Sequence, residues 1–147
     1  METVVVLAMH GMPPADFRQE ELAEFFRLHS MVHSGSGGDR EDHRKRYAFL
    51  EDKMRRWPRN EQNDPFHGAS RQLAAHLSRE SGYEVVVGHN EFCAPDLYEA
   101  LESAADKGAG KIIVVTPMMT RGGDHAEKDI PVVIDRFRTL CPEIDVV

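Results

Sequence analysis

The sequence predicts an α/β protein in which a parallel four-stranded sheet is flanked by helices, a flavodoxin-like three-layer αβα arrangement. Two observations support this fold class. Short runs rich in Val and Ile recur along the chain, and such runs are typical of strands that are buried on both faces of a parallel sheet. Segments with apolar residues at helical spacing separate these runs, and this alternation favours parallel strands joined by right-handed crossovers.

The first predicted strand is Thr3–Met9, and the turn His10–Pro14 ends it. A helix is expected to follow. Asp16 is interpreted as its N-cap and Gln19 as the capping-box partner of Asp16. The apolar residues of this helix run to Leu28, where the amphipathic pattern stops.

Residues 29–68 are interpreted as a polar, basic helical insert. The small polar residues 33–39 predict a mobile loop, and an apolar stripe from Tyr47 to Trp57 predicts a helix. Residues 39–59 hold eight Lys/Arg and five Asp/Glu, although the whole chain has 18 basic and 25 acidic residues. This basic helix suits a substrate that carries several carboxylates, but a solvated charged face explains the same pattern equally well.

The second half of the chain supplies the other strands. A helix that began at His125 would contain Pro131 in its interior, so we expect His125 in a loop and a helix that is capped by Asp129. The remaining predicted elements are a helix at Gly68–Arg79, a strand at Tyr83–Gly88, a helix from Asp96 to about Lys107, a strand at Ile112–Val115 and a short strand at Ile144–Val147.

Length and composition limit the possible functions. The 147 residues predict one domain, 1–147, and the net charge of −7 argues against nucleic-acid binding. Two cysteines indicate a reducing compartment, which predicts a cytoplasmic protein. No apolar stretch has the length of a membrane span, and the first apolar run is too short for a signal sequence. A serine hydrolase is excluded because Gly-x-Ser-x-Gly is absent, and His10–Pro14 lacks the cradle of a phosphate or nucleotide binder.

Three candidate metal ligands follow three predicted strands: His10, Glu91 and His125. A parallel sheet places the carboxyl ends of its strands at one edge, so residues that are distant in sequence converge there. Two imidazoles and a carboxylate suit a divalent iron, cobalt, nickel or zinc ion, and an incomplete ligand set suits exchange or catalysis. Each residue taken alone is more often a surface or hydrogen-bonding group.

The residues around these ligands resemble the class II chelatases of the sirohydrochlorin cobaltochelatase and ferrochelatase (CbiX/SirB) family. The resemblance rests on Val-Leu-Ala-Met-His10-Gly11, on Glu91-Phe-Cys-Ala-Pro95, and above all on the segment that runs from Thr116-Pro117 through Arg121-Gly-Gly-Asp-His125 to Asp129-Ile-Pro131. It covers residues 3–28 and 69–147.

The resemblance implies insertion of a divalent metal, Co²⁺ or Fe²⁺ and alternatively Ni²⁺, into a sirohydrochlorin-type tetrapyrrole. The metal is a substrate, and no organic cofactor is expected. His10 and His125 would be metal ligands and catalytic residues, with Glu91 as the acidic ligand. Short family members are expected to pair as homodimers, and no nucleic-acid or membrane partner is expected. Substrate binding is assigned to Met12, Met118, Met119 and Arg121, since methionines offer a soft apolar wall to a macrocycle. Met118 and Met119 alternatively pack beneath the loop.

A second hypothesis stays open at this point. A protein of the same fold that binds a metal or a tetrapyrrole without turnover, such as a carrier or a regulatory subunit, would show the same residues. Activity with sirohydrochlorin and a metal separates the two.

Overall fold

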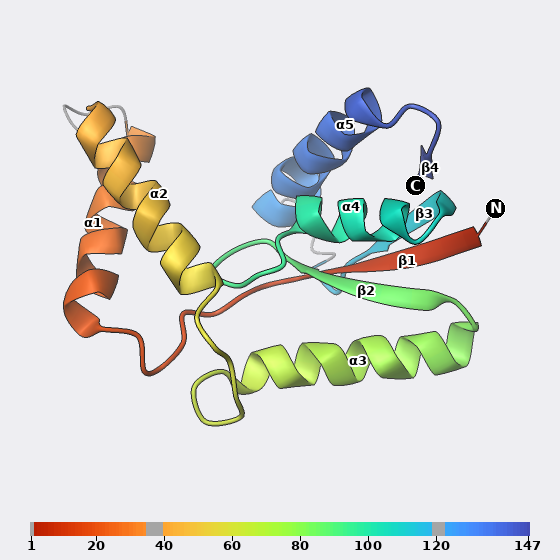
Figure 1. The fold of residues 1–147 in the computed structure, drawn as a ribbon, viewed down its shortest axis with the longest axis horizontal. Coiled ribbons are helices and arrows are strands. Elements are labelled where there is room, and N and C mark those ends of the chain that lie inside the picture. The colour runs from red at the N-terminus through yellow and green to blue at the C-terminus, as the bar shows by residue number, and fades with distance from the viewer. Residues whose placement is uncertain (1, 35–39, 119–122) are drawn as a thin grey trace.

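In a computed structural model, residues 2–34, 40–118 and 123–147 are described. Four strands form one sheet in the order β2-β1-β3-β4, and every neighbouring pair is parallel (Figure 1). This confirms the predicted four-stranded parallel sheet and the α/β class. The strands are β1 (Glu2–Met9), β2 (Glu84–His89), β3 (Ala109–Val115) and β4 (Asp145–Val146).

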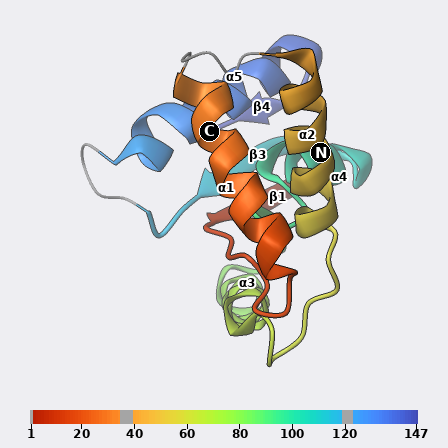
Figure 2. The same ribbon diagram turned by 90° about the vertical axis from the view of Figure 1, so that its left-hand side faces the viewer.

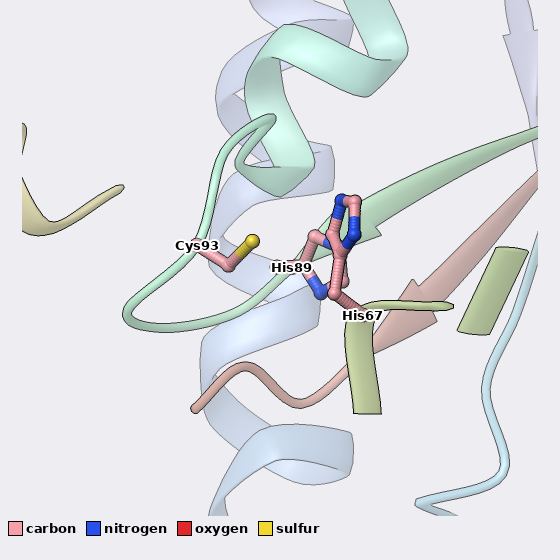
Figure 3. A group of neighbouring side chains, drawn as sticks. All are labelled: His67, His89 and Cys93. Atoms are coloured by element: carbon pink, nitrogen blue, oxygen red, sulfur yellow. The ribbon is translucent and has the colours of Figure 1, made fainter. Parts of the chain in front are cut away.

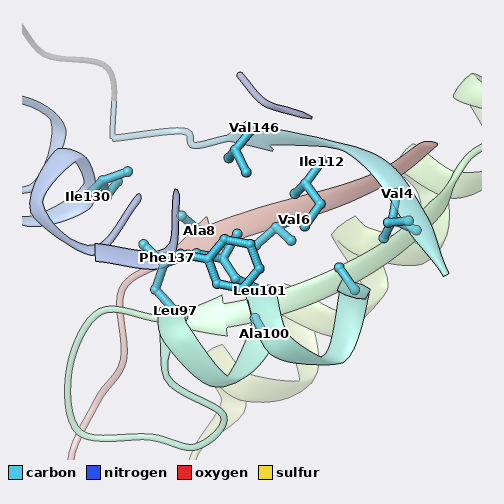
Figure 4. Close-up of a cluster of buried hydrophobic side chains, with 12 residues drawn as sticks. Val4, Val6, Ala8, Leu97, Ala100, Leu101, Ile112, Ile130, Phe137 and Val146 are labelled. Atoms are coloured by element: carbon cyan, nitrogen blue, oxygen red, sulfur yellow. The ribbon is translucent and has the colours of Figure 1, made fainter. Parts of the chain in front are cut away.

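Helices cover both faces of the sheet. α4 (Leu97–Asp106) and α5 (Ile130–Leu140) lie on one face, and α3 (Pro65–Ser81) lies on the other (Figures 1 and 2). The apolar run of β1 serves both layers because its side chains alternate between the faces. Val4, Val6 and Ala8 pack with α4 and α5 (Figure 4), whereas Leu7 and Met9 pack against α3.

Two helices begin where the sequence offers capping groups. Asp64 accepts a hydrogen bond from the backbone N–H of His67, and Pro65 follows it at the first position of α3, where a missing N–H costs little. Asp96 and Glu99 form a capping box at the start of α4. Both caps place helix N-termini next to the carboxyl end of β2.

α1 (Gln19–Ser34) and α2 (Glu41–Arg55) form a helical hairpin that stands beyond the carboxyl ends of the strands (Figures 1 and 2). The hairpin has a core of its own, because its buried residues form a cluster separate from those of the sheet. Its buried members are Phe17, Phe25, Leu28, Leu50 and Met54.

The sequence interpretation of α1 was wrong at both ends. Asp16 does not cap the helix: its carboxylate accepts hydrogen bonds from the Trp57 and Asn63 side chains instead. The helix also continues past Leu28 through Ser34, although the sequence placed His33 and Ser34 in a loop. The cause is tertiary, since α2 packs alongside this last part of α1 and Tyr47 hydrogen-bonds His29. The remainder of the predicted loop, residues 35–39, lies outside the described residues.

The basic residues of the insert are largely matched by carboxylates. Arg46 bonds Glu24 at 2.6 Å and Lys53 bonds Glu21 at 2.8 Å, so two of these cations join α2 to α1. Arg56 reaches Glu99 at the start of α4 at 2.7 Å. The charges therefore hold the hairpin together and against α4, which favours the structural interpretation of the basic helix over substrate binding.

The start of α5 also differs from the prediction. A single wide turn, η1 (His125–Asp129), precedes α5, so His125 begins a helical turn and does not lie in a loop. Asp129 has helical backbone angles and makes no side-chain capping bond. Pro131 gives the physical reason, because a regular α-turn would bring its ring against the carbonyl one turn earlier and a wider turn relieves that clash. Among the described residues, no helix is long and apolar enough to cross a membrane.

Candidate metal centre

His10 and Glu91 meet at the carboxyl edge of the sheet. β1 and β2 are neighbours, and the loops that follow them bring His10 Nδ1 to 2.8 Å from Glu91 Oε1. Both groups keep access to solvent, with 47% and 25% of the side chains exposed. In the tautomer in which Nδ1 donates to the carboxylate, the lone pair lies on Nε2. A carboxylate that orients a histidine in this way is the usual companion of a metal-bound imidazole.

Hydrogen bonds tie the two loops together behind this pair. The backbone N–H of Asn90 and its side-chain amide both donate to the Met9 carbonyl, at 2.8 and 3.0 Å. His89 Nδ1 donates to the His10 carbonyl at 2.8 Å. His10 is therefore fixed through its own backbone and that of Met9, which preorganises the site.

Arg59 connects these loops to the hairpin. Its guanidinium pairs with Asp64 at 2.6 Å, and the exposed fractions of the two side chains are only 4% and 1%. The same guanidinium donates to the backbone carbonyls of Met12, after His10, and of Phe92, after Glu91. It also donates to Met54 at the end of α2. One buried cation thus joins both ligand-bearing loops, α2 and the start of α3.

A cavity of about 420 Å³ opens beside His10. Met9 and His10 line it at the end of β1, and Pro117 and Met118 line it after β3. The cavity therefore unites the ends of two strands, as the parallel topology predicts, and its size is in the range of small-molecule sites. Phe66 also lines the cavity, as do Gly123, Asp124 and Ala126, which are close to His125 in the chain.

Of the other predicted site residues whose side chains the structure describes, only Met118 is found in the lining of this cavity. Met118 lies where a wall residue is expected, but Met12 is 48% exposed and is not part of this cavity lining. Met119 and Arg121 lie outside the described residues. The backbone of His125 starts η1, next to two lining residues, so its assignment as a ligand stays a prediction.

A second cavity of about 450 Å³ lies between the hairpin and the loop after β2. Glu91 is on its wall, so the His10–Glu91 pair stands between the two cavities. The hairpin contributes His29, His33 and Tyr47, and burial lowers the pKa of His29 and raises that of Tyr47. The lining is aromatic and polar, which suits a flat, polar-edged ligand.

Sequence reasoning missed a group of possible ligands behind His10. One ligand atom each from His67, His89 and Cys93 lies within 4.8 Å of the other two (Figure 3). Burial lowers the pKa of both imidazoles and raises that of the thiol. His89 follows a predicted strand directly and carried a readable signal, whereas nothing in the local sequence pointed to His67.

Gly11 allows the two ligand-bearing loops to touch. A Cβ at this position would overlap the Glu91 carbonyl oxygen and crowd the Cys93 nitrogen at 3.2 Å. Gly11→Ala is therefore expected to push the loops apart and to cost about 1–3 kcal/mol in the free energy of unfolding, as overpacking does. Cobalt affinity should fall with it.

Calorimetric cobalt titration and urea unfolding check this prediction. Gly82→Ala is a control for glycine loss as such, because Gly82 has a φ of 76° and open space around the position of a Cβ. This control should lose stability without losing cobalt affinity. Wild-type cobalt affinity in Gly11→Ala would contradict the role given to the loop contact.

Fold and site together define an α/β protein with a candidate metal centre where parallel strands end. Comparison with known proteins identifies its family. Residues 59–147 match the profile of the CbiX family, and the chain belongs to that family.

Two curated relatives are named sirohydrochlorin cobaltochelatase. The protein of Methanopyrus kandleri is 36% identical over 75 residues, which cover 50% of this chain and 49% of that protein. The protein of Methanococcus maripaludis is 34% identical over 64 residues, 43% of this chain and 44% of that protein. The chain thus spans about half the length of the curated relatives it matches.

Comparison with solved structures supports the fold through one of two matches. SirB from Bacillus subtilis with Fe³⁺ has a TM-score of 0.51 and 18% identity, over 99% of this chain and 38% of that chain. The sirohydrochlorin chelatase SirB from Bacillus subtilis subspecies spizizenii, in complex with cobalt, has a TM-score of 0.49 and 15% identity, over 99% and 42%. At 18% identity, the match to the structure with Fe³⁺ supports the α/β fold alone.

Proposed function

We propose that this protein inserts a divalent metal, cobalt or iron, into a sirohydrochlorin-type tetrapyrrole in the cytoplasm. The observation that carries the proposal is the His10–Glu91 pair, whose nitrogen and oxygen lie 2.8 Å apart beside a cavity that His10 lines, in a chain of the CbiX family. The names of the curated relatives support the substrate class.

Metal insertion requires loss of metal-bound water and removal of two pyrrole N–H protons. His10 suits both tasks, because a neutral imidazole ligates and later accepts a proton near neutral pH. Glu91 offsets the metal charge and holds the imidazole in the ligating tautomer. His125, whose chain neighbours Asp124 and Ala126 line the cavity, is proposed as the second histidine ligand.

The macrocycle is proposed to lie across the two cavities that flank this pair. Met118 would supply an apolar wall, and Met12, Met119 and Arg121 would contact the periphery of the ring. Glu91 borders the hairpin cavity, where Tyr47 and the two histidines of α1 offer polar contacts to carboxylate side groups. Placing the metal between the cavities puts it near the centre of such a ligand.

Turnover separates this proposal from a carrier without catalysis. Purified protein is mixed with sirohydrochlorin and Co²⁺, and the absorbance change of the macrocycle is followed against a control that contains metal and macrocycle only. We expect a rate that rises with protein concentration over several turnovers. A rate equal to the control, with cobalt still bound to the protein, would refute the enzyme and support the carrier.

We further propose that two copies pair, each providing part of the substrate cleft. Val115 on β3 shares a sheet face with Leu7 and Met9, yet α3 on that face contacts β2 and leaves Val115 only partly buried. Light scattering should give twice the chain mass of 16.6 kDa. A monomer at micromolar concentration would contradict the pairing.

A further inference from the structure

A second possible metal site lies where β2 ends and α3 begins, close to the backbone of His10. Its three members come from different elements: His67 from the first turn of α3, His89 from the last position of β2, and Cys93 from the loop after β2 (Figure 3). The three ligand atoms lie within 4.8 Å of one another. None of the three belongs to the residues that we assign to metal insertion.

The backbone holds each of these side chains in place. Asp64 caps α3 by accepting the N–H of His67, and Asp64 is itself fixed by Arg59. The His89 N–H donates to the Pro95 carbonyl at 2.9 Å, and Arg55 donates to the Cys93 carbonyl at 3.0 Å. Hydrogen bonds to the backbone therefore fix the positions of all three residues in the fold.

The protonation of His89 favours ligation. A carbonyl oxygen only accepts, so the 2.8 Å contact between His89 Nδ1 and the His10 carbonyl requires Nδ1 to carry the proton. In the neutral ring the lone pair then lies on Nε2, and a backbone carbonyl is a common partner of a metal-bound histidine. The His67 ring stacks on that of His89 at 5.8 Å between centroids.

The distances suit a small contraction around an ion. Metal–nitrogen and metal–sulfur bonds of about 2.0–2.3 Å place tetrahedral ligands about 3.3–3.8 Å apart. Cys93 is 1% exposed, and its sulfur points toward the imidazoles (Figure 3). Two imidazoles and a thiol are the ligands that borderline-soft ions prefer.

An ion can reach this group from outside. His67 and His89 line a cavity of about 510 Å³ between α3 and β2, together with Val85, Val87 and Pro95. This cavity is distinct from the one beside His10, with which it shares no lining residue. It leaves room for a water molecule as a fourth ligand.

We propose that His67, His89 and Cys93 form a second metal site that takes a borderline-soft divalent ion such as Zn²⁺ or Co²⁺. Binding forms two metal–nitrogen bonds and one metal–sulfur bond, and the Cys93 thiol releases its proton to solvent. The His89–His10 hydrogen bond links this site to the backbone of the strand-end histidine. An ion here would lock α3 to the loop that carries Glu91.

Cobalt provides the test, because thiolate ligation gives Co²⁺ a near-ultraviolet charge-transfer band. The reduced full-length protein is titrated with Co²⁺. Because the site at His10 would also take cobalt, we expect the band to saturate by two equivalents. It should be absent in Cys93→Ser and persist in Cys141→Ser, which removes the only other cysteine of the chain. His10→Ala should also retain the band, since it leaves all three ligands in place.

A second variant covers the case in which Cys93→Ser fails to fold. His67 is only partly buried, and His67→Gln is expected to keep the circular dichroism spectrum while lowering cobalt affinity at this site at least tenfold. The proposal is overturned if the wild type shows no thiolate band. It is equally overturned if folded Cys93→Ser or His67→Gln retains the band with wild-type affinity.

Discussion

Replacing Arg59 by methionine is expected to lower the free energy of unfolding by about 3–5 kcal/mol, the cost of breaking a buried ion pair by removing one partner. The variant leaves Asp64 charged at 1% side-chain exposure, and it removes the Arg59 hydrogen bonds to the carbonyls of Met12 and Phe92. The Met54 carbonyl loses Arg59 but keeps the Trp57 backbone N–H. Urea unfolding followed by circular dichroism measures the change.

Arg56→Met is the matched control. Arg56 lies three residues earlier and pairs with Asp52 and Glu99, but its side chain is 58% exposed. A surface pair contributes little, so the control should change stability far less. An equal loss in the two variants would mean that Arg59 is not the connection between the strand-end loops and the hairpin.

The double variant His10→Ala/His125→Ala is expected to lower cobalt affinity at the strand ends more than about 100-fold, since losing even an outer-shell partner of a metal costs about 10–100-fold. Calorimetric titration should use a Cys93→Ser background, in which the second proposed site is disabled and the heat measured comes from cobalt binding at the strand ends. Circular dichroism should stay unchanged, because the His10 side chain is about half exposed and its loss leaves the backbone hydrogen bonds of the strand-end loops in place.

Two further variants sharpen that experiment. Glu91→Gln keeps the shape of the side chain and removes its charge, and we expect a loss of about 10–100-fold in cobalt affinity. His76→Ala removes an exposed histidine of α3 and should bind as the wild type does. Unchanged affinity in the double variant would remove both histidines from the metal site.

The convergence of His10 and Glu91 was predictable because it depends on topology alone. Each residue follows an apolar run that is recognisable as a buried strand, and parallel neighbours bring such residues to one edge. The register that pairs Met9 with His89 then places the two following loops side by side. Strand periodicity and crossover rules were sufficient here, and no long-range packing had to be known.

The hairpin and the second group of ligands depend on contacts that local sequence does not encode. Asp16 has the residue type of a helix cap. Its carboxylate instead accepts a hydrogen bond from the indole of Trp57, 41 positions further along the chain. α1 continues through His33 because α2 lies against it. His67 joins His89 only because the Asp64 cap places the first turn of α3 under the end of β2.

The wide turn before α5 shows a different limit. The sequence correctly identified Pro131 as incompatible with a regular helix that begins at His125. It did not anticipate that a π-type turn would resolve the conflict without a loop. Several backbone conformations are compatible with a proline at position 131. The proline rule therefore excluded a regular helix, but it could not distinguish a loop from a π-type turn.

The location of cobalt in crystals soaked with Co²⁺ tests the central claim most directly. Anomalous scattering at the cobalt edge identifies the ion without assumption about its ligands. We predict a peak about 2.0–2.2 Å from His10 Nε2, on the side of the ring away from the Glu91 carboxylate and at the wall of the cavity that Met118 lines. Cobalt elsewhere in the crystal, with none at His10, would contradict the assignment of the metal centre.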